Sequence, residues 1–305
     1  MRFFHSWRKV PEAFQNAVIA IGNFDGFHRG HYAVVEKAVE VGKQLHRPVM
    51  LMTFEPHPSA YFRPGGRTFR ITPIRAKVRA ICALPIDGFF VFAFNRVFAE
   101  TTARQFVEDV LIDGLHAAAL VVGEDYGFGH NREGDVEYLQ KNYPALPVYP
   151  VAKLRDFNGE IISSSRIRAF IRDGHVAQAA KLTGRPFDFE GYVVHGFKRG
   201  RVIGFPTINI EPHDSIVPRL GVYAAKVLLD GEWKPALANI GTRPTVDGEG
   251  ILLEAHILNY NGDLYGKRLR VQLTEFIRPE QKFASLIELK RQIEQDMNQI
   301  KRILE

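Results

Sequence analysis

Cysteine is almost absent from this sequence of 305 residues, in which Cys82 stands alone. A single thiol cannot form an internal disulfide, and a metal site built from several thiolates is excluded for the same reason. Such cysteine usage is typical of a reducing compartment. We therefore expect a cytoplasmic protein.

Long apolar runs are missing as well. The most apolar stretches, AVIAIG and FFVFAF, are far shorter than the roughly 20 residues that a membrane-spanning helix needs. The opening MRFFHSWRKVPEAFQ has cations but no continuous apolar segment of the kind that a secretion signal carries. We expect no export signal and no membrane anchor.

Extended runs of one charge sign are also absent, although the formal net charge is +6. Such a modest surplus is typical of a solvated surface, and it leaves open an affinity for polyphosphates or nucleic acid. Hydrophobic residues make up 46% of the chain, which predicts packed cores. Because 305 residues exceed the size at which one core usually keeps growing, two domains are expected.

The first part of the chain, residues 1–183, alternates apolar strands with segments that can hold helices. Val34, Ala38, Val41 and Leu45 share one helical face after the first strand. This alternation predicts a parallel sheet covered by helices on both faces, an α/β Rossmann-like domain. The expected strands are residues 17–22, 48–54, 88–94, 118–123 and 147–152.

After SSSRIRAFIRDGHVAQAAKLTGR, which predicts two short helices with Gly174 ending the first, the pattern changes near residues 182–186. Period-two stretches then follow, separated by the turn pairs Asp230-Gly231, Asp247-Gly248 and Asn261-Gly262. We expect an antiparallel β-barrel over residues 184–305, and the amphipathic SLIELKRQIEQDMNQIKRIL predicts a C-terminal helix.

The string GNFDGFHRGH, residues 22–31, lies between the first strand and the first helix. In that geometry backbone amides and the positive end of a helix converge on an anion, although the spacing differs from the GxGxxG fingerprint. His28 and His31 project to one side, where both can donate to one phosphate, and Gly30 leaves room for a nucleotide. The same pair could instead cap the helix or bind a metal.

A second glycine-rich string, GFKRGRVIGFPTINI, covers residues 196–210. Its glycines Gly196, Gly200 and Gly204 permit a backbone to approach phosphates closely, and Lys198 and Arg201 supply positive charge. The string is not a Walker A loop. It predicts a second, different phosphate site.

Oxygen-bearing side chains accompany this second string. Thr207 and Asn209 alternate on a strand, and their oxygens are hard ligands of the sort that Mg²⁺ accepts. Glu254, in LLEAHILNY, could accept the proton of an alcohol or could simply be a solvent-facing strand residue.

These motifs resemble, in order, those of one protein family. GNFDGFHRGH is similar to the (H/T)xGH motif of the nucleotidyltransferase superfamily, and TFEPHP, VGEDYGFGHNREGD and ISSSRIR continue the likeness. GFPTIN resembles the GxPTxN signature of riboflavin kinases. Together they resemble the bacterial bifunctional riboflavin kinase/FAD synthetases over nearly the whole chain.

The resemblance implies that the C-terminal domain phosphorylates riboflavin with Mg-ATP and that the N-terminal domain transfers AMP from ATP to the resulting FMN. It implies catalytic roles for Glu254, His28 and His31, with Mg²⁺ held by Thr207 and Asn209. The implied ATP- and phosphate-binding residues are Gly22, Asn23, Phe24, Asp25, Gly30, Ser164, Ser165, Arg168, Gly196, Lys198, Gly200, Arg201 and Gly204. The implied flavin-binding residues are Phe54, Asp125 and Arg278.

The chain departs from the family pattern at two positions. Family members usually have DFRFG where this sequence has DYGFG at 125–129, so a guanidinium is lost at Gly127, and Asn259 stands where aspartate is frequent. One alternative is therefore a riboflavin kinase with a weakened or inactive adenylyltransferase domain. Another is a binding protein that stores flavin or contacts nucleic acid without ATP turnover. We expect riboflavin, FMN and ATP as partners, no nucleic acid, no membrane, and a monomer or weak homo-oligomer.

Overall fold

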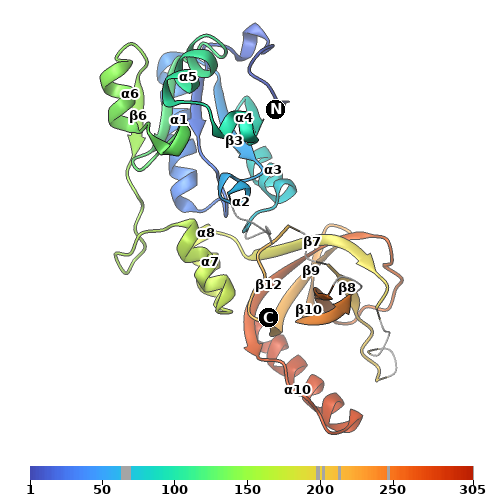
Figure 1. Ribbon diagram of the computed structural model, residues 1–305. Helices are drawn as coiled ribbons and strands as arrows, with labels where there is room; N and C mark the ends of the chain where they lie inside the picture. Colours follow the sequence, from blue (N-terminus) through green and yellow to red (C-terminus); the bar gives the residue numbers. More distant parts are fainter. Residues whose placement is uncertain (63–69, 197–199, 201–202, 212–213, 246–247, 305) are drawn as a thin grey trace. The chain divides into compact units, whose positions relative to one another are not determined.

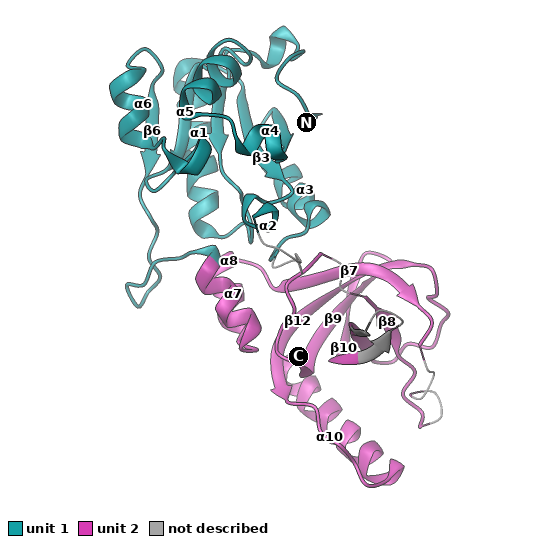
Figure 2. Cartoon of the chain, viewed as in Figure 1, with its two compact units in different colours: residues 1–164 teal, residues 165–305 magenta. Residues whose placement is uncertain are grey.

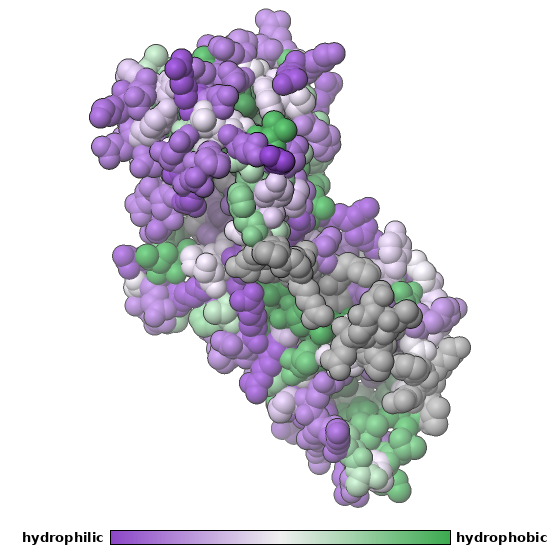
Figure 3. All heavy atoms as spheres, viewed as in Figure 1, coloured by the Kyte–Doolittle hydropathy of each residue, from purple (hydrophilic) through white to green (hydrophobic). Residues whose placement is uncertain are grey.

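The computed structural model describes the chain except for residues 63–69, 197–199, 201–202, 212–213, 246–247 and 305. The chain divides into two compact units, residues 1–164 and 165–305 (Figure 2). None of the described helices combines the length and apolar character that crossing a membrane requires. On the face seen in Figure 3, hydrophilic side chains cover most of unit 1.

Unit 1 is built on a six-stranded parallel sheet with the order β1-β4-β3-β2-β5-β6 (Figure 1). The five predicted strands are confirmed with small shifts at their ends. The additional edge strand β1 was not predicted, because three residues are too few to show a periodic pattern. The strands are β1 (Arg2–Phe4), β2 (Val18–Ile21), β3 (Val49–Glu55), β4 (Gly88–Ala93), β5 (Ala119–Gly123) and β6 (Val148–Val151).

Both faces of this sheet are covered, as the alternating pattern predicts. Val18 and Ala20 of β2 point into the cluster that holds the apolar face of α1, whereas Ile19 and Ile21 point into the opposite cluster. The helical segments are η1 (Glu12–Phe14), α1 (Arg29–Leu45), α2 (Pro58–Tyr61), α3 (Ile74–Cys82), α4 (Arg96–Ala99), α5 (Ala103–Gln105), the π-helical η2 (Phe106–Ile112), η3 (His130–Arg132) and α6 (Val136–Asn142).

Two short helices precede the barrel, as predicted: α7 (Ser164–Arg172) and α8 (Val176–Thr183), with Gly174 at a left-handed φ of 85° between them. Helix α8 packs against two barrel strands, β7 (Phe187–Val194) and β12 (Arg268–Arg278). This packing places both helices, apart from Ser164, in the same compact unit as the barrel. The expected domain boundary near residue 183 stays a prediction.

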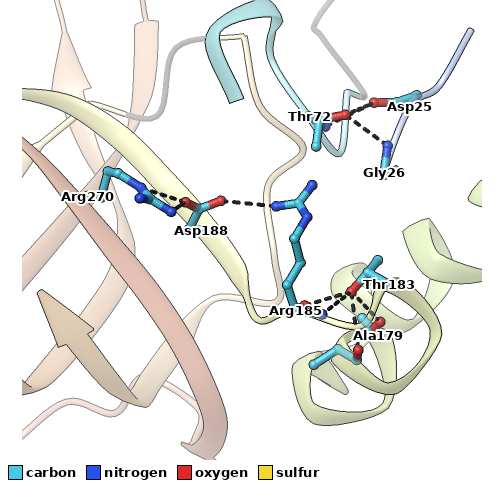
Figure 4. Close-up of polar contacts among 9 residues, drawn as sticks. Asp25, Gly26, Thr72, Ala179, Thr183, Arg185, Asp188 and Arg270 are labelled. Atoms are coloured by element: carbon cyan, nitrogen blue, oxygen red, sulfur yellow. Dashed lines mark hydrogen bonds and ion pairs between the residues drawn. The ribbon is translucent and has the colours of Figure 1, made fainter. Parts of the chain in front are cut away.

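An ion-pair cluster holds the entry into the barrel (Figure 4). At the last residue of α8, the Thr183 hydroxyl donates to the Arg185 carbonyl oxygen at 2.6 Å, and the Ala179 carbonyl oxygen lies 3.1 Å from the same Oγ1. The buried carboxylate of Asp188 then pairs with Arg185 at 3.7 Å and with Arg270 at 2.8 Å. The end of α8 is thereby tied to β7 and β12.

Unit 2 is a closed barrel with the strand order β10-β11-β8-β7-β12-β9, and every pair in it is antiparallel. It confirms the predicted barrel, and the C-terminal helix is confirmed as α10 (Leu286–Leu304). The strands not yet given are β8 (Ile208–Ile210), β9 (Gly221–Leu229), β10 (Glu232–Thr245) and β11 (Gly248–Ile257).

The three predicted turn pairs have different outcomes. Asp230 and Gly231, both with positive φ, connect β9 to β10, whereas Asp247 lies outside the described residues. Asn261-Gly262 does not join neighbouring strands, because β12 pairs with β7 and β9 rather than with β11. A local turn signal carries no information about which strands meet when a sheet closes.

Candidate active sites

The histidine turn lies at the carboxyl end of β2 and leads into α1. His28 is the N-cap of α1, and its Nδ1 accepts a hydrogen bond of 3.3 Å from the backbone amide of His31. The Nδ1 of His31 accepts in return from the amide of His28, also at 3.3 Å. The two rings stack with their centroids 3.7 Å apart. The helix-capping alternative is therefore realised in the structure.

Capping uses only Nδ1 of each histidine, and each ring has a second nitrogen, Nε2. When Nδ1 accepts from a backbone amide, a neutral imidazole carries its proton on Nε2, which is then a donor. Gly30 lies against this stack, since a Cβ there would come within 3.1 Å of the His28 ring. The arrangement thus leaves two parallel imidazoles, each with a donor directed away from its own cap.

Phe24 and Asp25 shape the turn through their side chains. Phe24 is buried against Phe27, with the ring centroids 5.6 Å apart. The buried Asp25 carboxylate accepts a hydrogen bond from the amide of Thr72 at 2.9 Å (Figure 4). It also accepts from the amide of Ile71 at 3.2 Å. These two side chains are therefore engaged in holding the turn, and their roles in ATP binding stay predictions.

A buried lysine supports the same turn and was missed by the sequence analysis. Lys77 of α3 donates at 2.8 Å to the carbonyl oxygen of Asn23, which also accepts from Thr53 Oγ1 at 3.1 Å. Burial lowers the pKa of Lys77, and the nearby Asp25 and Glu55 carboxylates oppose that shift. A lysine within the amphipathic IRAKVRAIC resembles a surface residue, so the sequence carries no signal for it.

An aromatic cavity of about 610 Å³ opens beside Gly22 and Asn23. It contains the predicted flavin residues Phe54 and Asp125, and the Asp125 carboxylate pairs with Lys153 at 3.0 Å. A volume of this size and flat aromatic faces suit a tricyclic ring. The aromatic side chains lining it are Phe54, Phe62, Phe94, Phe98, Phe106, Tyr126 and Phe128.

Ser164 lies close to the histidine turn, whereas two other predicted pyrophosphate ligands belong to unit 2. The Ser164 hydroxyl donates to the Asp25 carbonyl oxygen at 2.7 Å. Ser165 is exposed and Arg168 is half-buried on α7. Their binding of phosphate stays a prediction.

In the barrel, the strand register brings three polar residues into one row. Glu254 of β11 lies opposite Asn209 of β8 on one side and opposite Asn239 of β10 on the other. Residues paired in this way project to the same face of a sheet. Asn239, whose Nδ2 donates to Glu280 at 3.1 Å, was not predicted, because only the register shows that it neighbours Glu254.

Asn209 has the environment of a ligand residue. Its side chain is buried, and Oδ1 has no hydrogen-bond partner in the described part of the chain. Gly196 lies directly against it, since a Cβ there would come within 2.5 Å of Nδ2 and 2.7 Å of Oδ1. An orphaned amide oxygen is costly unless something binds it, and with the half-buried Thr207 it fits a hard cation such as Mg²⁺.

The remaining glycines of the string adopt tight geometry around a second cavity. Gly200 accepts at 2.8 Å from the amide of Phe205, and a Cβ at Gly200 would clash with the Phe205 carbonyl oxygen. Gly204, with φ of 89°, lines a cavity of about 860 Å³ together with Thr207 and Asn259. The predicted cations Lys198 and Arg201 lie outside the described residues.

Arg278 is held by the C-terminal helix. Its Nε and Nη2 donate to the carboxylate of Asp296 at 3.0 Å and 2.8 Å, and the Asp296 side chain is buried. The guanidinium also lies 5.8 Å from the centroid of the Phe283 ring. Its predicted contact with flavin stays a prediction, and its structural role is to fasten α10 to the end of β12.

Comparison with known proteins identifies two domains in the chain. The family model for FAD synthetase matches residues 10–166, and the one for riboflavin kinase matches residues 183–304. Bifunctional riboflavin kinase/FMN adenylyltransferases from Escherichia coli K12 and Haemophilus influenzae are 42% and 36% identical to this chain. The first alignment covers 97% of this chain and 95% of the relative, and the second covers 99% and 98%.

A solved structure matches both units. The crystal structure of a macrolide-efflux protein from Streptococcus pneumoniae has a TM-score of 0.88 and 30% identity, and 98% of each chain is covered. Two domain models and near-complete relatives support the bifunctional prediction rather than the alternative of a kinase alone. The chain belongs to the bifunctional riboflavin kinase/FMN adenylyltransferase family, with an FAD synthetase domain followed by a riboflavin kinase domain.

Proposed function

We propose that the chain makes flavin cofactors in two steps. The barrel phosphorylates the 5′-hydroxyl of riboflavin with ATP, giving FMN and ADP. Unit 1 then transfers AMP from a second ATP to FMN, giving FAD and pyrophosphate. The observation that carries the proposal is the division of the site residues into two independent sets, the paired imidazoles beside an aromatic cavity and the Asn209–Glu254 row of the barrel.

In the kinase step, Glu254 accepts the hydroxyl proton while the riboflavin oxygen attacks the γ-phosphorus of ATP and ADP leaves. The orphaned Oδ1 of Asn209 and the hydroxyl of Thr207 would hold Mg²⁺, which when bound neutralises charge on the phosphates. Gly196 lets the amide of Asn209 sit against the main chain. The glycine-rich string is proposed to bind the triphosphate, with Lys198 and Arg201 as its cations.

In the adenylyl transfer, a phosphate oxygen of FMN attacks the α-phosphorus of ATP, and the bond to pyrophosphate breaks. This nucleophile is already anionic, so no general base is needed. His28 and His31 donate from Nε2 to the phosphoryl oxygens as charge develops there. Ser164, Ser165 and Arg168 hold the pyrophosphate, and the flavin ring lies in the cavity with Phe54 and Asp125.

The deciding experiment supplies purified protein with flavin and ATP analogues and separates the products by chromatography. Riboflavin with Mg-ATP should give FMN and then FAD. A β,γ-imido ATP, which cannot donate its γ-phosphoryl group, should still convert FMN to FAD, whereas an α,β-methylene ATP should support only FMN formation. A protein that forms neither product from ATP would overturn the proposal.

The same experiment separates the remaining alternatives. A protein that only stores flavin or contacts nucleic acid would turn over no ATP and would bind DNA or RNA with strong salt dependence. The proposal includes riboflavin, FMN and ATP as its small-molecule partners, a cytoplasmic location and a monomer or weak homo-oligomer. Titration with DNA and RNA and measurement of the mass in solution test those parts.

A further inference from the structure

The space over Gly127 is filled by a side chain from five residues further along the chain. A Cβ at Gly127 would come within 2.8 Å of Nη2, 2.9 Å of Nε and 3.0 Å of Cζ of Arg132. The guanidinium therefore occupies the place that any side chain at position 127 would need. Gly127 predicts the loss of a guanidinium here, and in the structure Arg132 supplies one from a later position in the chain.

The local backbone explains how Arg132 reaches back. Gly129, Asn131 and Arg132 have positive φ values of 76°, 52° and 58°, and the amide of Arg132 donates to the Gly129 carbonyl oxygen at 3.0 Å. This tight left-handed turn reverses the chain. Nη2 of Arg132 then donates to the carbonyl oxygen of Asp125 at 3.2 Å, which holds the guanidinium in place.

Arg132 lines the aromatic cavity of unit 1 with an exposed side chain, and its guanidinium brings a positive charge to that lining. Of the described residues that line this cavity, Arg132 is the single arginine or lysine. The Asp125 carboxylate in the same lining is paired with Lys153. Burial raises the pKa of Tyr126, and the charge of Arg132 opposes that shift, as expected for a cation beside the phenol.

The sheet topology places this cation at the end of the sheet where transfer is proposed to occur. Strands β2 and β5 are parallel neighbours, with Ala20 opposite Val121. The segments that follow them, with Gly22 and Asn23 on one side and Asp125 on the other, meet at the same edge and line the same cavity. A ligand phosphate at that edge can therefore contact the lining that contains Gly22, Asn23 and Arg132.

We propose that Arg132, seated in the space left by Gly127, binds the phosphate group of FMN and so selects FMN over riboflavin for adenylyl transfer. The inference rests on the proposed function of this site. Riboflavin and FMN share the ring and the ribityl chain and differ in one phosphate, so ring contacts cannot separate them. A guanidinium fork matches the geometry of phosphate oxygens and remains charged at every working pH.

The test compares three variants in the full chain: Arg132→Gln, Arg132→Lys and Gly127→Ala. Each is assayed for FAD formation with β,γ-imido ATP, which prevents the kinase from consuming riboflavin. Riboflavin is added as a competitive inhibitor against FMN. Arg132→Gln should raise KM for FMN by about tenfold or more, as the loss of a charge-assisted hydrogen bond implies, while KM for the ATP analogue and Ki for riboflavin change by less than about twofold.

The other two variants separate charge from position. Arg132→Lys should fall between Arg132→Gln and the parent protein, because it keeps the charge but loses the fork. Gly127→Ala should resemble Arg132→Gln, because the added Cβ displaces an unchanged guanidinium. Arg104→Gln, which removes an exposed arginine paired with Glu108 on α5 and η2, is the matched control and should change nothing.

Two results would overturn the inference. One is an unchanged KM for FMN in Arg132→Gln, and the other is a KM for FMN and a Ki for riboflavin that rise by the same factor, since Arg132 would then only shape the cavity. Riboflavin kinase turnover and the unfolding midpoint of each variant verify that it is folded. If the parent protein itself forms no FAD from FMN, the proposed function fails instead, before any variant is compared.

Discussion

Nζ of Lys77 and the carbonyl oxygen of Asn23 are joined by a hydrogen bond of 2.8 Å, so the segment that leads into the paired histidines rests on a buried amine. Thr53 donates to the same oxygen from the end of β3. Because that oxygen points into the protein, it is kept away from the incoming phosphates. Lys77 is therefore a positioning residue for the adenylyl transfer site.

Replacing Lys77 with methionine should lower FAD formation from FMN by about tenfold while riboflavin phosphorylation stays unchanged, because only unit 1 loses an internal hydrogen bond of its active site. The effect should appear mainly in kcat, since no substrate contact is removed. Steady-state kinetics of the two activities measure this. Arg75→Met, at an exposed position of the same helix, is the control.

The same variant should change the pH dependence of stability. The pKa of Lys77 is lowered from its ordinary value of 10.5 in the folded state, so the unfolded chain binds more protons between the folded pKa and 10.5. The contribution of Lys77 to the free energy of unfolding therefore rises with pH across that window. Urea titrations from pH 7 to pH 10 should show a smaller rise for Lys77→Met, and an unaltered slope would contradict the burial argument.

Substitutions of His28 can separate its capping role from its catalytic role. Asparagine is a good N-cap, so His28→Asn should keep most of the stability, whereas His28→Ala should lose about 1 kcal/mol. Both should reduce FAD formation by roughly 100-fold or more, because both remove the imidazole Nε2 that is proposed to donate to the reacting phosphate. Full activity in His28→Asn would show that the ring matters only as a cap.

Two changes around Asn209 should slow the kinase while leaving adenylyl transfer intact. Asn209→Ala removes the orphaned Oδ1, and Gly196→Ala pushes a Cβ to within 2.5 Å of the Asn209 amide. Each should lower riboflavin phosphorylation by about tenfold or more and raise the Mg²⁺ concentration needed for half-maximal activity. Conversion of added FMN to FAD serves as the control, and its loss in a folded variant would argue against two independent sites.

Removing one partner of the ion pair between Arg278 and Asp296 should destabilise the protein more than removing both. Arg278→Met leaves a buried carboxylate without its partner, which should cost about 3 kcal/mol of unfolding free energy. Combining Arg278→Met with Asp296→Leu should recover much of this loss, because the buried charge is then gone. Chemical denaturation, followed by a spectroscopic signal from the barrel, measures the unfolding free energy of the single and the double variant. If Arg278 also contacts flavin, the double variant will regain stability but not its KM for riboflavin.

Much of the candidate site could be predicted because its signals are local in the chain. The histidine turn and the PTIN strand each place their chemistry within a few consecutive residues, and strand or helix periodicity fixes which side chains share a face. Lys77 and Asn239 could not be found in this way, because each acts through a residue that is distant in sequence. Arg132 occupies the space that a side chain at position 127 would need, and it reaches that space through a left-handed turn. The residue types do not specify this turn.

The sequence by itself determined the alternation of strands and helices, the change to antiparallel strands, and the composition of the two glycine-rich segments. All of these follow from short-range periodicity and turn chemistry. Only the tertiary structure decided which strands pair in the closed barrel, which carboxylate holds Arg278, and which guanidinium lies against Gly127. These features depend on the packing and burial of groups that are far apart in the chain. The free energy of such contacts is gained only when the chain folds.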